Sequence, residues 1–176
     1  MLECYLGDSY DLVKRFWSKS LEPIGPLYAH PKFVPSAIYA KYTAVTSVPI
    51  LGTRPEGHCG ILLDPDTGVP LPSSSSHSAT RSHASLQFIV DLTRELHPDY
   101  MICFDQSYHR KHALNRDEQK EAKRTFLSDQ GIVSFYYVSH APFLFMASEK
   151  KILRSVLGRL ISLGIPKRLF HPSDIV

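Results

Sequence analysis

Three apolar segments of this 176-residue chain each lead to an aspartate, a residue that could do chemistry at the end of a strand. Asp8 follows residues 2–6, Asp64 follows the residues GILL, and Asp105 follows YMICF. If the segments are parallel strands, their carboxyl ends meet at one edge of a sheet, where ligands bind. Carboxylates that meet repel one another, and a bound Mg²⁺ relieves that repulsion. The pattern predicts a Mg²⁺ site formed by Asp8, Asp64 and Asp105, with Asp8 and Asp105 as the catalytic pair.

Each aspartate also has a structural interpretation. Asp8 can cap a helix by accepting hydrogen bonds from the free amides of the first turn. Asp64 stands beside Pro65 and Asp66, in a turn where aspartate forms local hydrogen bonds. Asp105 is the hardest to explain structurally, because its strand is apolar on both faces and polar side chains follow it.

Basic residues gather in the part of the chain that follows Asp105. Residues 1–106 carry 8 Lys and Arg against 11 Asp and Glu, whereas residues 107–176 carry 12 against 6. This asymmetry fits either two ordinary solvated surfaces or a basic region that steers a phosphate ester toward an acidic metal site. In the second interpretation Arg110 and Lys111 bind phosphate, and the partner is nucleic acid or another phosphate ester.

Histidines add two secondary candidates, His109 and His140. His109 and His112 are three residues apart and share one side only if the segment is helical. His140 is either a core or turn histidine that is hydrogen-bonded to backbone, or a general base or phosphate contact.

These residues must be positioned by alternating strands and helices. Apolar spacing predicts helices that end near residue 21 and before Pro98, a polar helix over 116–128, and a last helix capped by Ser148. Strands are expected at 2–6, at 100–104 and within 131–140 and 142–147, with 2–6 and 99–105 adjacent and parallel. The pattern predicts one α/β domain over residues 1–176: a three-layer Rossmann-like fold with a mainly parallel sheet and a C-terminal β-hairpin.

Other segments are less regular. Prolines over 22–35 predict an extended surface connection, and residues 36–51 fit either a short helix or a strand. The Ser-rich stretch 73–83 is a linker or a functional loop.

Composition limits the cellular setting. Cys4, Cys59 and Cys103 are far apart and form no CxxC motif, which predicts reduced thiols. No apolar run approaches the roughly 18 residues that a membrane span needs. We therefore expect a cytoplasmic protein without a membrane segment.

The stretch SLQFIVDLTRELHPDYMICFDQSYHR resembles the helix, strand and terminal Phe-Asp of 5′-nuclease domains, the flap endonuclease and PIN-like group. YLGDSYDLVKRF is similar to the first strand, acidic turn and Arg-bearing helix of that group, with Arg15 in the matching place. The resemblance implies Mg²⁺-dependent cleavage of phosphodiester bonds, with Asp8 and Asp105 on the metal and Arg15, Arg110 or Lys111 on the phosphate. The further acids of that group have no counterpart here beyond Glu149.

Two other functions remain open. Gly7, Asp8 and Ser9 are similar to the first block of GDSL-type hydrolases, in which the serine is the nucleophile, but the closing Asp-x-x-His of that family is missing. An incomplete acidic cluster also fits a non-catalytic α/β binding or interaction protein.

Overall fold

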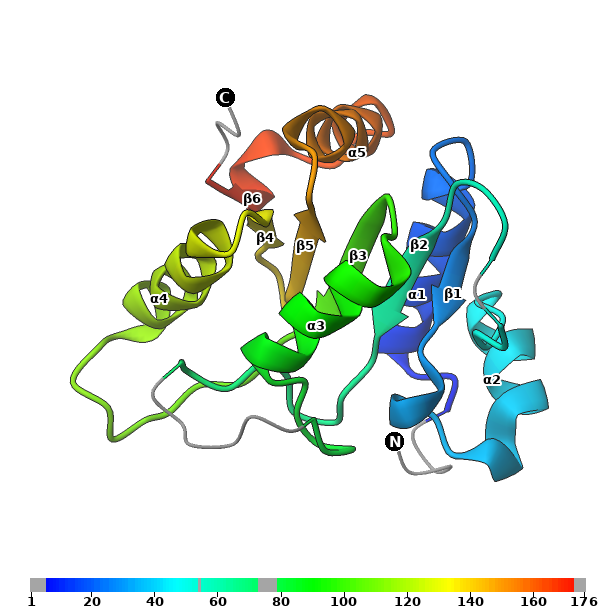
Figure 1. Ribbon diagram of the computed structural model, residues 1–176, viewed down its shortest axis with the longest axis horizontal. Helices are drawn as coiled ribbons and strands as arrows, with labels where there is room; N and C mark the ends of the chain where they lie inside the picture. Colours follow the sequence, from blue (N-terminus) through cyan, green and yellow to red (C-terminus); the bar gives the residue numbers. More distant parts are fainter. Residues whose placement is uncertain (1–5, 54, 73–78, 173–176) are drawn as a thin grey trace.

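The computed structural model describes residues 6–53, 55–72 and 79–172, which form a six-stranded mixed sheet with five α-helices (Figure 1). The α-helices are α1 (Ser9–Leu21), α2 (Tyr39–Thr46), α3 (Leu86–Leu96), α4 (Arg116–Asp129) and α5 (Lys150–Ser162). The strands are β1 (Leu27–Ala29), β2 (Gly60–Leu63), β3 (Tyr100–Phe104), β4 (Val133–Tyr137), β5 (Phe143–Ala147) and β6 (Phe170–His171).

The sheet has the strand order β1-β2-β3-β5-β4-β6. β1, β2 and β3 are parallel neighbours, whereas the pairs β3/β5, β5/β4 and β4/β6 are antiparallel. The prediction of a mainly parallel sheet is therefore corrected: parallel pairing stops at β3. The reason lies in the short connection from Tyr137 to Phe143, which reverses the chain and inserts β5 between β3 and β4.

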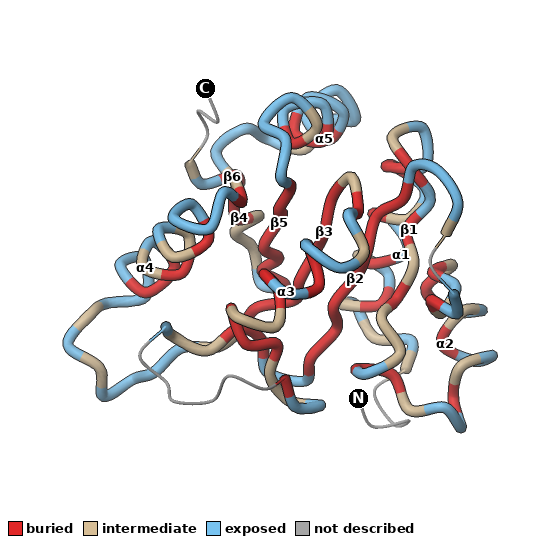
Figure 2. Tube along the Cα trace, in the orientation of Figure 1, coloured by how far each residue is buried: buried red, intermediate tan, exposed pale blue. Residues whose placement is uncertain are grey.

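Both faces of the sheet are buried. In β3, Tyr100, Ile102 and Phe104 belong to a core that includes residues of α1, α2 and α5. The alternate residues Met101 and Cys103 belong to a second core with residues of α3 and α4. Strands β2, β3 and β5 are buried along their whole length (Figure 2), which explains why their sequences are continuous apolar runs.

The helices around the candidate residues are confirmed. Ser85 caps α3 by accepting a hydrogen bond from the Phe88 amide, and the helix ends at His97 in the left-handed conformation, before Pro98. Asn115 and Glu118 form a capping box at the start of α4. The prediction that Ser148 caps the last helix is wrong by one residue. The N-cap position of α5 is occupied by Glu149, whose side chain makes no capping hydrogen bond.

One further expectation is corrected by the sheet, and another falls outside the described residues. The proline-rich segment 22–35 contains the edge strand β1, whose side chains Leu27 and Ala29 are buried. In the described residues β3 lies between β2 and β5, and the prediction that residues 2–6 pair with β3 falls largely on residues outside the described ranges. Residues 1–5 of that segment, and 73–78 of the Ser-rich stretch, lie outside the described residues.

The ambiguous segment 36–51 contains α2. None of the helices in the described ranges is both long and apolar enough to cross a membrane.

Candidate ligand-binding site

Asp64 and Asp105 directly follow the parallel strands β2 and β3, at the sheet edge where these strands end. In the register of the two strands Leu63 pairs with Cys103, so Asp64 is level with Phe104 and Asp105 lies one residue further on. Because side chains alternate between the faces of a sheet, this offset sends the two carboxylates to opposite faces. The Asp64 carboxylate is hydrogen-bonded to residues of α1 and α2 on one face of the sheet. The Asp105 carboxylate is hydrogen-bonded to a residue of α4 on the other face.

On the first face, Asp64 is part of a buried polar cluster. Its Oδ2 accepts hydrogen bonds from Lys14 Nζ at 2.7 Å and from the Tyr42 hydroxyl at 3.1 Å. Lys14 Nζ also donates to Asp11 Oδ1 at 2.9 Å. Burial disfavours the charge of Lys14, but attraction to Asp64 and Asp11 outweighs it and raises the pKa of the ammonium. Burial, reinforced by Asp64, raises the pKa of the Tyr42 hydroxyl well above 10.

On the second face, Asp105 has a similar pair of partners. Its Oδ2 accepts hydrogen bonds from Lys123 Nζ at 2.7 Å and from the Tyr136 hydroxyl at 2.7 Å. Burial, followed by the charge of Asp105, raises the pKa of that hydroxyl well above 10. The other oxygen, Oδ1, accepts from the amides of Val69 at 2.9 Å and Ser107 at 3.1 Å. Asp105 is thus a fully bonded anion between the loops that follow β2 and β3.

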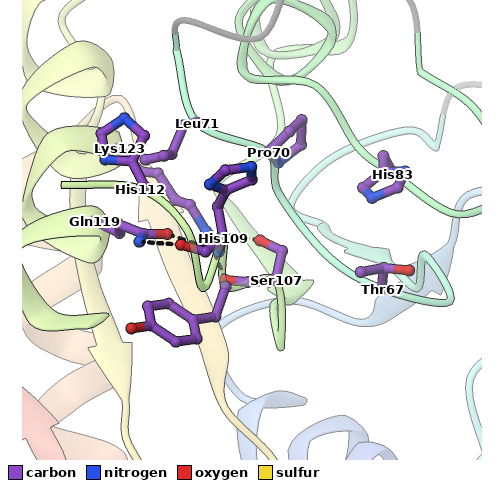
Figure 3. A pocket seen from close by; sticks show the side chains of 10 residues that line it. Thr67, Pro70, Leu71, His83, Ser107, His109, His112, Gln119 and Lys123 are labelled. Carbon is purple, nitrogen blue, oxygen red and sulfur yellow. Dashed lines mark hydrogen bonds between the residues drawn. The ribbon is translucent and has the colours of Figure 1, made fainter. Parts of the chain in front are cut away.

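A pocket of about 350 Å³ lies beside the Asp105 cluster (Figure 3). The pocket is formed by the loop between β2 and α3, which includes His83, by the loop after β3, and by α4. The lining residues are Thr67, Pro70, Leu71, His83, Ser107, Tyr108, His109, His112, Gln119 and Lys123. This set contains three histidines and a lysine but no aspartate or glutamate, so the part of the pocket that the structure describes offers no carboxylate to a ligand.

The buried side chain of Gln119 holds the loop that carries the histidines. Its Oε1 accepts a hydrogen bond from the His109 amide at 3.0 Å, and its Nε2 donates to the His109 carbonyl at 3.0 Å (Figure 3). The same Nε2 donates to the Leu114 carbonyl at 2.8 Å. Three bonds from one side chain of α4 therefore fix the irregular segment after Ser107.

One pocket histidine has its ring orientation set by the backbone. His112 Nδ1 accepts a hydrogen bond from the Leu114 amide at 3.1 Å, so in the neutral ring the proton is on Nε2. The rings of His109 and His112 lie with their centroids 5.9 Å apart. An Nε2–H of this kind is a suitable donor to an anionic oxygen.

Ser107 contacts Lys123 without forming a catalytic dyad. Its hydroxyl lies 2.8 Å from Lys123 Nζ and 2.6 Å from Asp105 Oδ1, and it also contacts the Val69 carbonyl. A lysine bonded to a carboxylate as an ammonium has no free electron pair with which to remove the serine proton. The contact therefore binds the loop to α4 and leaves Ser107 a weak nucleophile.

The predicted residues near the N-terminus lie apart from this pocket. Asp8 caps α1, with its Oδ1 accepting from the amides of Tyr10 at 2.9 Å and Asp11 at 3.1 Å. Ser9 is exposed at the first turn, and within the described ranges it makes no hydrogen bond to a histidine. Arg15 is exposed, and the buried cation of this helix is its neighbour Lys14.

The remaining candidates divide between the pocket and its surroundings. His109 lines the pocket, and Arg110 and Lys111 are exposed on the same loop, between His109 and His112. His140 is exposed in the β4–β5 connection, its ring centroid 5.8 Å from that of Tyr10.

Sequence reasoning missed the two lysines that matter most. Lys14 is placed three residues before Trp17, and Lys123 four residues before Leu127, on the buried faces of α1 and α4. A lysine on the apolar stripe of an amphipathic helix, in a chain whose strands end in aspartate, is the signal that predicts such pairs.

The geometry gives little support to the predicted magnesium site. Asp64 and Asp105 are separated by the sheet and each has a lysine partner, while Asp8 is a helix cap. Across residues 6–53, 55–72 and 79–172, no group of three or more His, Cys, Asp or Glu side chains could hold a metal ion. Comparisons of the chain with protein-family models, with curated proteins and with solved structures found no match.

Proposed function

We propose that this chain is a phosphate-ester-binding protein and that the ligand occupies the pocket between the loops after β2 and β3. The observation that carries the proposal is the composition of that pocket, which is lined by His83, His109 and His112 and, among the described residues, by no carboxylate. A Rossmann-like three-layer domain binds its ligands at this edge of the sheet, outside the carboxyl ends of parallel strands.

Electrostatics supports an anion over a neutral ligand. The charge of Lys123 is balanced by Asp105, so the excess positive charge comes from Arg110 and Lys111 on the loop. Neither residue forms an ion pair within the described residues. His112 adds a directed Nε2–H donor, which suits a phosphate oxygen.

Mg²⁺-dependent hydrolysis of the bound ester stays a prediction. A catalytic metal at Asp105 would have to displace Lys123 and the Tyr136 hydroxyl from the same carboxylate oxygen. Binding without cleavage is therefore the function that the contacts support best.

The test is a titration of the ¹⁵N-labelled protein with ribose 5-phosphate, followed by two-dimensional NMR. We expect the amide signals of the segments 67–71 and 107–112 to shift, and those of α5 to stay in place. Replacing both Arg110 and Lys111 with alanine should weaken binding several-fold, because two favourable charges are lost. The matched control replaces Lys150 and Lys151, two exposed lysines at the start of α5, and should bind as the wild type does.

Two outcomes would count against the proposal. Absence of any shift with millimolar ribose 5-phosphate would refute phosphate-ester binding at this pocket. Equal weakening by both double variants would show that net charge, and not this loop, attracts the ligand. Adding Mg²⁺ and monitoring release of inorganic phosphate tests the hydrolysis prediction in the same samples.

A further inference from the structure

Tyr108 is an aromatic side chain that the fold leaves uncovered at the pocket. Its exposed fraction is 42%, and among the exposed large apolar and aromatic side chains of the described residues it alone lines the pocket. Among the described residues, the Tyr108 ring stacks on no other aromatic ring. The neighbouring rings of His109 and His112 contact each other. An uncovered ring that lines a cavity provides a flat surface on which a planar ligand group can stack.

The backbone on both sides of Tyr108 is held in place. The Ser107 amide donates to Asp105 Oδ1 at 3.1 Å, and the His109 amide donates to Gln119 Oε1 at 3.0 Å. The backbone that carries Tyr108 is thus held in place, so a ligand that stacks on the ring orders little more than that one side chain.

The pocket has an apolar part as well as a basic one. Pro70 and Leu71, both half-buried, line it together with the ring of Tyr108, while the histidines and Lys123 supply polar groups. A sugar phosphate has no group that would use the apolar part. A planar base joined to a phosphate uses both parts.

The size of the pocket favours one such unit over a polymer. Its volume of about 350 Å³ lies at the lower end of the roughly 300–1,000 Å³ that is usual for small-molecule sites.

We infer that the ligand is a mononucleotide whose base stacks on Tyr108 and whose phosphate contacts the loop carrying His109 and His112. The inference rests on the proposed function, because it assigns a chemical class to the ester that binds there. It also gives Tyr108 the role of distinguishing nucleotides from other phosphate esters.

Calorimetric titration with AMP, ribose 5-phosphate, adenosine and a single-stranded oligonucleotide tests the inference. We expect the wild type to bind AMP about tenfold more tightly than ribose 5-phosphate, the size of effect expected for one base stacked on an aromatic ring. Tyr108→Ala should remove this advantage and leave ribose 5-phosphate binding unchanged, whereas Tyr108→Phe should retain it. Phe16→Ala, which removes an exposed ring from α1, is the matched control and should behave as the wild type.

The failures of the two proposals can be told apart. If AMP and ribose 5-phosphate bind equally and Tyr108→Ala changes neither, the nucleotide inference is wrong and phosphate-ester binding stands. If neither phosphate compound binds, both proposals are wrong. If ribose 5-phosphate binds but adenosine binds as tightly as AMP, the phosphate adds nothing to nucleotide binding and the nucleotide inference alone is wrong. Tighter binding of the oligonucleotide than of AMP would overturn the choice of a mononucleotide.

Discussion

Lys123 Nζ lies 2.7 Å from Asp105 Oδ2, and both side chains are only 1% exposed. Neither charge can be screened by solvent, so each depends on the other and on the surrounding hydrogen bonds. Loss of one partner from a buried pair is far more harmful than replacement of both, because it leaves an uncompensated charge in the interior. The pair therefore explains why a hydrophobic strand can end in a buried aspartate.

Lys123→Met should destabilise the protein by about 3–5 kcal/mol, because it leaves the Asp105 carboxylate buried without its cation. The double variant Lys123→Met/Asp105→Asn should lose less than the sum of the two single losses, since no buried charge remains. Urea unfolding of the four proteins measures this coupling. Additive losses would mean that the two side chains do not interact in solution.

Several elements around this pair can be predicted from sequence because their signals are local. Helix α3 is marked by Ser85 before its apolar stripe and by Pro98 beyond its end, and β3 by a run of five apolar residues. Both signals depend only on residues within the element or next to it. The order of β3, β5 and β4 in the sheet has no such local signal.

The separation of Asp64 from Asp105, which the sequence did not predict, has a specific cause. Asp64 and Asp105 do end neighbouring parallel strands, but β3 extends one residue beyond the register of β2. A slip of one residue moves a side chain to the opposite face of a sheet. Register is set by packing across strands that are distant in the chain, so the sequence of either strand alone does not contain it.

Gly68→Ala should destabilise the protein by about 1–3 kcal/mol and weaken ligand binding. Gly68 has φ +133°, and a Cβ there would lie 2.4 Å from Asp105 Oδ1 and 2.7 Å from the Asp105 Cα. Since the second contact is with backbone, the loop after β2 must move away from Asp105. Gly52→Ala, where a Cβ meets nothing within 4 Å, is the control for urea unfolding. Equal stability of the two variants would show that this close approach is absent in solution.

Gln119→Met should loosen the pocket loop more than it harms the rest of the fold. The change removes three part-buried hydrogen bonds between Gln119 and the loop, each worth about 0.5–1.5 kcal/mol. Hydrogen exchange should accelerate at residues 107–114 and stay unchanged in β3. Gln87→Met, which removes an exposed bond to Asp91, is the control. Unchanged exchange over residues 107–114 would show that Gln119 does not hold the loop.

His30 should make the protein less stable as the pH falls. Burial, and to a lesser degree the charge of Lys32, lowers the pKa of His30 from 6.5 to about 4. Between these two values the unfolded chain binds a proton at this position that the folded chain does not, so stability contributed by the neutral ring is lost as pH falls from about 6.5 towards 4. The ring packs on Phe33 and Phe88, where a charge is poorly solvated.

The measurement is urea unfolding across this pH range for the wild type and His30→Asn. We expect the variant to lose less stability on acidification than the wild type, because it no longer carries the histidine, while the carboxylates titrate in both. His140→Asn removes an exposed histidine and should follow the wild-type curve. If His30→Asn and the wild type lose the same stability over this range, His30 accepts its proton as readily in the folded chain as in the unfolded one. Its contact with the two phenylalanines would then impose no cost on the charged ring.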